Sequence, residues 1–292
     1  MIVAIGELLA DCITTRFVKD LSKANKFKIF QGGSPSNVAA NLQWLGNDVA
    51  LVSCVGNDGI GKMLIKAVKK TGLNTDFIQV SEEMPSSLVM VARSKGTPDF
   101  IPYRMADRMI SEVDNNLLEK STIVHSCAFA MSKEPARTSI LNAFKFAYTN
   151  NKQVSVDWNF APSVWGKDDG FEIFNAIIEL NPLMKFSLDD IERFCRKIMN
   201  VEEAKSFLDQ YSSKLICLTL GKDGVWYKGI ENNWFYLPAN EVTSVKDTTG
   251  AGDAFWSGVL SAFSKNKDLH VCIQEGLNVA AQKVSKMGAL YA

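Results

Sequence analysis

The sequence predicts an α/β fold with a mostly parallel central sheet that is covered by helices on both faces. Apolar runs of strand length alternate with stretches of helical periodicity along most of the 292 residues. Hydrophobic residues make up 47% of the chain, which is enough for a large core. No linker-like segment or internal repeat divides the sequence, so we expect one continuous domain over residues 1–292.

The expected elements follow one another in regular alternation. The expected strands are residues 2–5, 49–55, 122–125, 154–157 and 215–220. The expected helices are residues 36–45, 59–70, 135–149, 171–180, 252–264 and 269–286. Gly46 is a typical stop for the first helix, and Pro135 is a typical helix start. This β-α repetition favours parallel strands joined by helices.

Two stretches interrupt the alternation. Residues 11–30 and 86–104 have strand-like composition without an intervening helix. We expect extra antiparallel strands, drawn from about residues 11–30 and 86–106, that form a small β-sheet lid over the carboxyl ends of the main strands. Asn232 and Asn233 lie between two further strand-like runs and are expected to form a hairpin turn.

Composition argues against several classes of protein. Lys plus Arg and Asp plus Glu each number 32, so no basic surplus points to nucleic acid or an anionic membrane. No run of 18 apolar residues predicts a membrane span, and the first residues do not resemble a signal peptide. The six cysteines form no C-x-x-C pair, which favours buried thiols and a cytoplasmic location. The two histidines, His125 and His270, are too few for a typical zinc site or Ser-His-Asp triad.

The most informative motif is Asp-Thr-Thr-Gly-Ala-Gly-Asp-Ala-Phe, residues 247–255. Gly250, Ala251 and Gly252 precede a helical pattern, so their backbone N–H groups can face an anion. Asp253 lies in the first helical turn beside that cradle. An anion cradle next to a carboxylate suits phosphoryl transfer, because one part holds phosphate charge and the other accepts a proton. Taken alone, the motif also fits a tight turn with an acidic helix cap.

Three further segments offer binding chemistry. Gly32 and Gly33 let a backbone approach a ligand closely, and Asn37 offers a donor and an acceptor to a polyol. Asp11 follows the first strand and can accept hydrogen bonds from two sugar hydroxyls. The run Leu-Thr-Leu-Gly-Lys-Asp-Gly, residues 218–224, can lie against a nucleotide. Each also has a plain structural explanation: a strand-to-helix turn, a solvated acid and a hairpin turn.

A fourth segment is a false lead. Residues 56–63 nearly match the phosphate-binding pattern G-x-x-x-x-G-K-[ST], but Met63 stands where the motif needs a hydroxyl for Mg²⁺. A turn into the helix 59–70 is the simpler interpretation.

Together, these motifs resemble the PfkB, or ribokinase-like, family of carbohydrate kinases. The resemblance rests on Gly-Gly-Ser-Pro-Ser-Asn-Val-Ala-Ala-Asn, residues 32–41, and on residues 247–255, which match the family's two signatures in order and approximate separation. It implies a three-layer α/β/α sandwich with a small β lid. It also implies Mg²⁺-dependent transfer of the ATP γ-phosphoryl group to a primary hydroxyl of a small-molecule sugar. Lids in this family often pair, which implies a homodimer.

The resemblance assigns roles to residues. Asp253 would be the base, kept ionised by the helix dipole, and the amides from Gly250 to Asp253 would form the anion hole. The sugar would be held by Asp11, Gly32, Gly33, Asn37 and Arg104. The nucleotide would lie along Lys185, Thr219, Gly221, Gly224, Thr249, Gly252 and Asn278. Members often bind a monovalent cation such as K⁺ beside the cradle, and the carbonyls around Asp247 and Thr249 are the expected ligands.

Two positions depart from the family pattern. Many relatives carry Asp-x-Asn-x-Arg on the middle strand, whereas residues 157–161 end in Ala161. Relatives also carry Asn or Ser followed three residues later by Glu, a pair tied to Mg²⁺ and phosphate. Here Ser187 is followed by Asp190, which we expect to reach the metal through water.

The substrate is expected to be a neutral ketohexose. Ser34-Pro35-Ser36 and Tyr103-Arg104 are similar to the fructokinase and 2-keto-3-deoxygluconate kinase branch. Arg104 can bind a carboxylate or bridge neutral hydroxyls. Because Ala161 removes one carboxylate partner, fructose is favoured over the keto-acid, and the lack of a basic cluster disfavours a sugar phosphate. A non-catalytic sugar or nucleotide sensor of the same fold is the alternative class.

Overall fold

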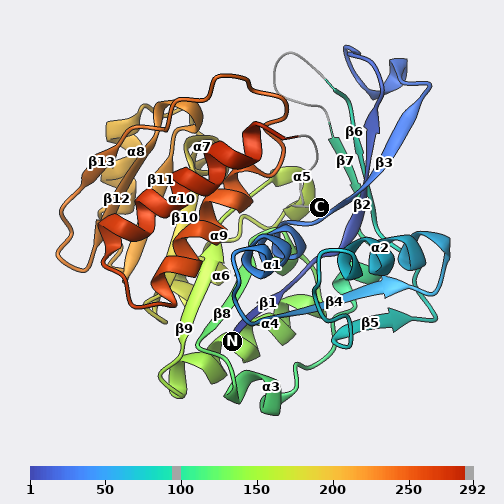
Figure 1. The fold of residues 1–292 in the computed structure, drawn as a ribbon, viewed down its shortest axis with the longest axis horizontal. Helices are drawn as coiled ribbons and strands as arrows, with labels where there is room; N and C mark the ends of the chain where they lie inside the picture. The colour runs from blue at the N-terminus through green and yellow to red at the C-terminus, as the bar shows by residue number, and fades with distance from the viewer. Residues whose placement is uncertain (94–99, 287–292) are drawn as a thin grey trace.

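A nine-stranded sheet forms the centre of the computed structural model, which describes residues 1–93 and 100–286. Its strands are β1 (Ile2–Ile5), β4 (Val49–Gly56), β5 (Ile78–Ser81), β8 (Ile123–Cys127), β9 (Gln153–Asp157), β10 (Leu183–Ser187), β11 (Leu215–Thr219), β12 (Val225–Gly229) and β13 (Phe235–Leu237). The order is β13-β12-β11-β10-β9-β8-β1-β4-β5 (Figure 1). From β11 to β5 all neighbours are parallel, whereas β12 and β13 are antiparallel additions.

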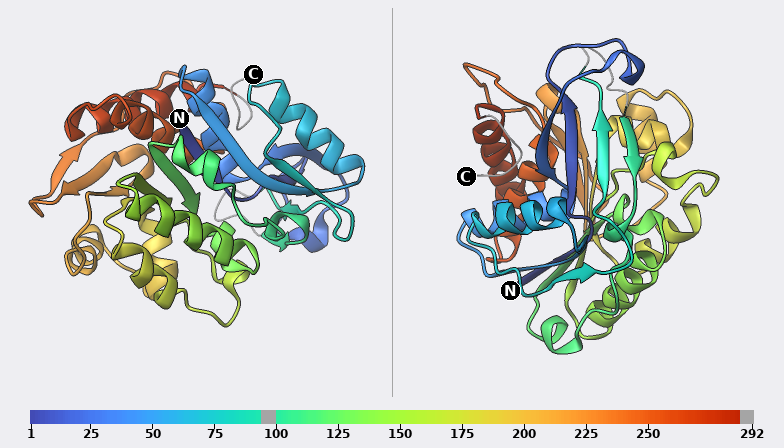
Figure 2. Two further views of the ribbon diagram at one scale, coloured as in Figure 1. Left: turned by 90° about the horizontal axis from the view of Figure 1, so that it is seen from below. Right: turned by 90° about the vertical axis from the view of Figure 1, so that its right-hand side faces the viewer.

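Helices cover both faces of this sheet. One face carries α1 (Ser34–Trp44), α2 (Gly59–Lys69), α9 (Ala251–Phe263) and α10 (Leu269–Val284). The other face carries α3 (Asn115–Glu119), α4 (Ala136–Thr149), α5 (Pro162–Trp165), α6 (Phe171–Ile178), α7 (Leu188–Cys195) and α8 (Val201–Leu208). Each helix layer packs on the sheet through its own apolar core (Figure 2). The expected α/β class and its three layers are confirmed.

A second, small sheet projects from the body of the protein (Figure 1). It consists of β2 (Leu9–Thr14), β3 (Phe27–Gly32), β6 (Leu88–Val91) and β7 (Phe100–Tyr103), in the order β3-β2-β6-β7. The hairpin-like pairs β2–β3 and β6–β7 are antiparallel, as expected, but the central pair β2–β6 is parallel because its strands come from two separate excursions of the chain. Residues 94–99 of the expected lid stretch lie outside the described residues.

Several elements were not expected from the sequence. Strand β10 was not predicted because Lys185 interrupts its apolar pattern. That lysine is buried and forms an ion pair with Asp157 on the neighbouring strand β9. Strand β5 and helices α7 and α8 were also missed. Two helices begin earlier than expected, at Ser34 and Ala251. The hairpin turn is confirmed: β12 and β13 pair antiparallel, and Asn232 adopts a left-handed φ of 60°.

Gly33 caps the start of α1 and sets the position of that helix. Its φ of 109° is unfavourable for any residue with a side chain, and a Cβ there would lie 2.2 Å from the carbonyl oxygen of Glu7. The close approach brings the segment after β1 against the first turn of α1. Only glycine allows this contact.

We therefore predict that Gly33→Ala lowers the free energy of unfolding by about 2–4 kcal/mol, from backbone strain and the clash together. Urea titration would measure it. Gly59→Ala is the matched control, because a Cβ on Gly59 meets nothing within 4 Å. That variant should change stability by less than about 1 kcal/mol. Equal losses in the two variants would contradict the close approach at Gly33.

Candidate active site

The first turn of α9 presents free backbone amides. Gly250 adopts a left-handed conformation with φ 73° and turns the chain into the helix. No described residue accepts a hydrogen bond from the N–H groups of Gly252 or Asp253. The expected anion hole is narrower than the sequence suggested, because the N–H of Ala251 already donates to the carbonyl of Thr248 at 3.1 Å. The tight turn itself uses that amide.

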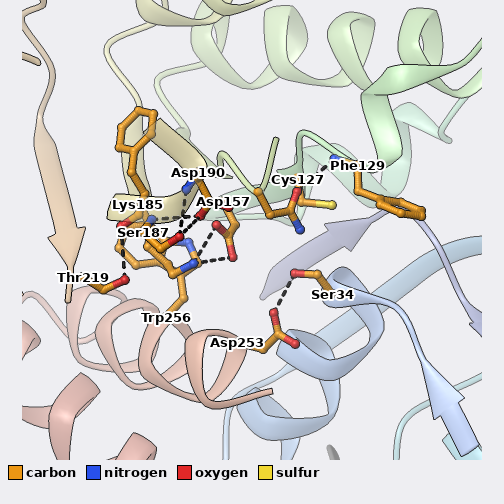
Figure 3. A network of polar contacts seen from close by, with 12 residues as sticks. Ser34, Cys127, Phe129, Asp157, Lys185, Ser187, Asp190, Thr219, Asp253 and Trp256 are labelled. Carbon is orange, nitrogen blue, oxygen red and sulfur yellow. Dashed lines mark hydrogen bonds and ion pairs between the residues drawn. The ribbon is translucent and has the colours of Figure 1, made fainter. Parts of the chain in front are cut away.

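The Asp253 carboxylate contacts the start of α1. Ser34 Oγ donates to Oδ1 at 2.7 Å (Figure 3). Asn37 Nδ2 donates to Oδ2 at 2.8 Å. Burial raises the pKa of Asp253 against the helix field, while the two hydrogen bonds and the nearby charge of Lys185 act to lower it. The result is a half-buried carboxyl group, with a pKa above its ordinary value, beside open amides.

Asp11 faces the same space from the small sheet. Burial raises the pKa of Asp11 to about 7, and the neighbouring carboxylate of Asp253 adds to the rise. A Cβ on Gly32 would lie 2.2 Å from Asp11 Oδ2, so only glycine leaves room for this carboxyl. The structure thus brings Asp253 together with Asp11, Gly32, Gly33 and Asn37, which lie more than 200 residues earlier in the sequence.

Glu7 is a site-supporting residue that sequence reasoning missed. Its Oε1 accepts the N–H of Ser34 at 2.9 Å, and the thiol of Cys127 donates to the same carboxyl group. Burial raises the pKa of Glu7 to about 7, although Arg104 acts to lower it. Glu7 therefore anchors the residue that holds Asp253. An acid inside the otherwise apolar run 2–10 was the available signal.

Two adjoining cavities open at the start of α9. An apolar cavity of about 560 Å³ is lined by Val242, Val245, Phe255, Leu277, Ala280 and their neighbours. A polar cavity of about 630 Å³ is lined by Asp157, Lys185, Asp190, Gly250, Ala251, Gly252 and Asp253, among others. Thr219, Gly221, Thr248, Ala251 and Gly252 line both. Each volume suits a small ligand, and the shared wall makes one continuous binding region.

The expected nucleotide residues fall into two groups. Thr219, Gly221, Gly224 and Gly252 line the apolar cavity. Thr249 is exposed, and its neighbour Thr248 lines the cavities instead. Asn278 is connected to the apolar cavity through Asn240. Its side-chain oxygen accepts a hydrogen bond from Asn240 Nδ2 at 2.8 Å, and Asn240 lines the cavity.

Lys185 lies at the floor of the polar cavity, beside the free amides. Its Nζ contacts both carboxylate oxygens of Asp157, at 2.8 and 2.9 Å (Figure 3). Burial acts to lower the pKa of Lys185, but the carboxylates of Asp157, Asp190 and Asp253 outweigh it and hold that pKa above its ordinary value. A Cβ on Gly252 would lie 3.3 Å from Nζ, so glycine keeps the cradle close to this cation.

The carboxylate of Asp190 is buried and hydrogen-bonded to other protein groups. Its Oδ2 accepts from the backbone N–H of Ser187 at 2.8 Å and from the hydroxyl at 2.6 Å, while Arg193 donates to Oδ1 at 3.2 Å. Within residues 1–93 and 100–286, no group of three or more His, Cys, Asp or Glu is arranged to hold a metal. Carboxylates do line the polar cavity, however, and Mg²⁺ is usually held by one or two carboxylates together with substrate phosphates.

The guanidinium of Arg104 is less free to bind a ligand than the sequence suggested. Its side chain is buried and forms an ion pair with Asp107. Nη1 donates to the carbonyl of Phe129 and to the hydroxyl of Ser132, each at 2.7 Å, and the guanidinium lies over the Phe129 ring. Only Nη2 has no hydrogen-bond partner among the described residues. Asp107 therefore neutralises much of the charge that would attract an anion.

This combination of fold and cradle agrees with what is known of similar proteins. The chain belongs to the PfkB family of carbohydrate kinases, whose family profile matches residues 1–292. It is 36% identical over 293 residues to an ATP-dependent 6-phosphofructokinase of Thermoanaerobacterium thermosaccharolyticum, covering 99% of this chain and 89% of the relative. It is 29% identical over 308 residues to a probable chloroplastic fructokinase of Arabidopsis thaliana, covering 99% and 76%.

Solved structures show the same architecture. The fructokinase of Halothermothrix orenii superposes with a TM-score of 0.85 at 33% identity, covering 96% of this chain and 97% of that one. A sugar kinase of Pyrococcus horikoshii in complex with ATP superposes with a TM-score of 0.84 at 26% identity, covering 99% and 94%. The protein is thus a carbohydrate kinase with the ribokinase-like fold. No helix in the described part of the chain is long and apolar enough to cross a membrane.

The raised pKa of Asp11 predicts a pH-dependent cost of folding. Between pH 4 and 7 the folded chain holds a proton on Asp11 that the unfolded chain has released, so stability falls as pH rises through this window. Asp11→Asn removes this cost. The stability of the variant relative to the parent should therefore increase from pH 4 to 7 in urea unfolding. A difference that stays constant with pH would contradict the buried, proton-binding carboxyl.

Proposed function

We propose that the enzyme transfers the γ-phosphoryl group of ATP to a primary hydroxyl of a neutral ketohexose, most simply fructose. The observation that carries this proposal is the half-buried Asp253 carboxylate, held by Ser34 and Asn37 beside the free amides of Gly252 and Asp253. A base and an anion hole on one helical turn match the needs of phosphoryl transfer, which depends on positioning and on electrostatic stabilisation.

In the proposed reaction, Asp253 accepts the proton of the sugar hydroxyl as that oxygen attacks the γ-phosphorus of ATP, and the bond to the bridging oxygen breaks to release ADP. The raised pKa brings Asp253 closer to the working pH, as general-base catalysis requires. The free amides of Gly252 and Asp253 donate to the transferring phosphoryl oxygens, and Lys185 adds positive charge beneath them. Asn37, already bonded to the base, and Asp11 would orient the sugar hydroxyls.

The two cavities suggest how ATP lies. The apolar cavity suits the adenine base, because aliphatic side chains such as Val242, Val245 and Leu277 form its wall. The polar cavity, which contains Lys185 and the start of α9, suits the phosphates. Mg²⁺ bound with ATP would neutralise phosphate charge, and the carboxylates of the polar cavity, such as Asp157 and, through water, Asp190, would hold it.

The candidate substrates differ in charge. The relative with 36% identity is named for fructose 6-phosphate, and the branch similarity also admits 2-keto-3-deoxygluconate. Both substrates are anionic. Arg104 is the expected anion partner near the sugar, but Asp107, Phe129 and Ser132 already engage its guanidinium. The internal neutralisation of Arg104 supports a neutral ketohexose.

An ADP-release assay over a panel of sugars tests this proposal. We expect kcat/KM for fructose to exceed those for fructose 6-phosphate and 2-keto-3-deoxygluconate by at least tenfold. Preferred turnover of either anion would overturn the substrate, and sugar binding without turnover would support the sensor alternative. A cytoplasmic enzyme is also proposed, in keeping with six free cysteines.

Replacing the proposed base tests the mechanism. Asp253→Asn keeps the shape of the side chain but cannot accept the proton, so we expect kcat to fall by about 10²–10⁴. Asp48→Asn is the control, since Asp48 is exposed and lines neither cavity. An Asp253→Asn enzyme within tenfold of the parent would rule out Asp253 as the base.

We also propose that two copies pair through the small sheet. The strand register places Ile29, Ile101 and Tyr103 on one face, and these side chains are 43–48% exposed. Their apolar surface would be covered by a second copy of the same sheet. We predict that Ile101→Glu converts a dimer to a monomer in sedimentation velocity. Ile198→Glu, at a position 88% exposed on the α7–α8 connection, should leave the association unchanged.

A further inference from the structure

Lys283 is a buried lysine directly behind the active-site loop. Its side chain is 1% exposed although it lies near the end of α10. Nζ donates to the carbonyl of Asp247 at 3.3 Å and to the carbonyl of Lys286 at 3.4 Å, and it lies 3.9 Å from Asp247 Oδ2. An ammonium group is thus held among backbone and carboxylate oxygens, close to where the catalytic motif begins.

The Asp247 carbonyl belongs to a loop that leads into the free amides. The N–H groups of Lys246 and Asp247 donate to the carbonyl of Val284, at 2.8 and 3.3 Å. The N–H of Thr249 donates to the Asp247 carboxylate at 3.0 Å, and Gly250 follows with its left-handed turn. Lys283 therefore completes a set of contacts that fixes the base of this loop to α10.

The charge of Lys283 is also felt at the proposed base. Burial lowers the pKa of Lys283, and the carboxylates of Asp247 and Asp253 offset this. In return, Lys283 is one of the charges that lower the pKa of Asp253. The ammonium thus acts on both the loop and the carboxyl group.

These contacts do not fit a bound K⁺ at the carbonyl of Asp247. A K⁺ site uses several carbonyl oxygens to replace the ion's hydration shell. Here an ammonium, a compact cation with three donors, already engages two of the nearby carbonyls. A second cation about 4 Å away would be repelled strongly enough to weaken its binding by about three orders of magnitude at an effective dielectric constant of about 20.

We propose that the Lys283 ammonium replaces the monovalent cation expected beside the cradle. It holds the carbonyl of Asp247, and through residues 247–250 it positions the amides of Gly252 and Asp253. Lys283 is a positioning residue in this scheme and contacts neither substrate. The proposal rests on phosphoryl transfer at the start of α9, and it makes the enzyme independent of added K⁺.

The unmodified enzyme gives the first test. Its kcat should change less than twofold when 100 mM KCl replaces tetramethylammonium chloride at constant ionic strength and saturating MgATP. Activation by tenfold or more would overturn the proposal. This measurement does not depend on the folding of any variant.

Two variants separate a cationic role from a structural one. Lys283→Ala removes the charge and leaves space, whereas Lys283→Met fills the space without charge. Without K⁺, we expect kcat to fall at least tenfold in both, with the sugar KM within about threefold. K⁺ or NH₄⁺ should raise the kcat of the alanine variant at least fivefold and leave the reduced kcat of the methionine variant unchanged. Full activity of the alanine variant without K⁺, or a loss that neither ion restores, would overturn the proposal.

Lys228→Met is the matched control. Lys228 is equally buried and also donates to backbone carbonyls, those of Leu208 and Tyr211, but it lines neither cavity. Its replacement should lower the melting temperature without creating a response to K⁺. A K⁺ response in this variant as well would show a general effect of lost buried charge and overturn the assignment.

Ion binding can be followed without turnover. Calorimetric titration with KCl should show no binding to the parent and binding to Lys283→Ala, whatever the sugar substrate is. K⁺ binding by the parent would overturn the cation proposal alone. A parent that turns over none of the sugars would instead count against the proposed function.

Discussion

The contact between the Asp253 carboxylate and the first turn of α1 organises the active site. Both oxygens of this carboxylate are hydrogen-bonded, one to Ser34 and one to Asn37. These two bonds join the beginnings of two helices, and Glu7 anchors the same turn through the amide of Ser34. Because the carboxylate is partly withdrawn from water, losing either bond would leave its charge less well compensated. The proposed base is therefore placed by hydrogen bonds that also connect α1 to α9.

The site is built from buried charges that compensate one another. Lys185 neutralises Asp157 beneath the cradle, and Arg104 neutralises Asp107 near the sugar side. Lys283 does the same behind residue 247. Each of these ion pairs reduces the net charge that its members present to a ligand. The guanidinium of Arg104, paired with Asp107, is an example. The open amides at the start of α9 escape such pairing, which leaves them available to a phosphate.

Two glycine contacts set the geometry of the proposed sugar side. A Cβ on Gly32 would overlap the carboxyl of Asp11, and a Cβ on Gly33 would overlap the carbonyl of Glu7. The small sheet, the end of β1 and the start of α1 can approach one another only because these side chains are absent. The geometry of the cleft thus depends on the same motif that identifies the family.

The sequence by itself determined the α/β class, the family and the two signature segments, because periodicity and short motifs are local properties of the chain. It did not reveal β10, since Lys185 breaks an apolar pattern that only its partner Asp157 on the neighbouring strand makes tolerable. It also did not show that Arg104 is neutralised by Asp107, that the amide of Ala251 is occupied, or that Lys283 reaches the carbonyl of Asp247. Only the tertiary structure decided these contacts. Whether a buried charge or amide has a partner depends on which groups, often distant in sequence, the fold brings within a few ångströms of it.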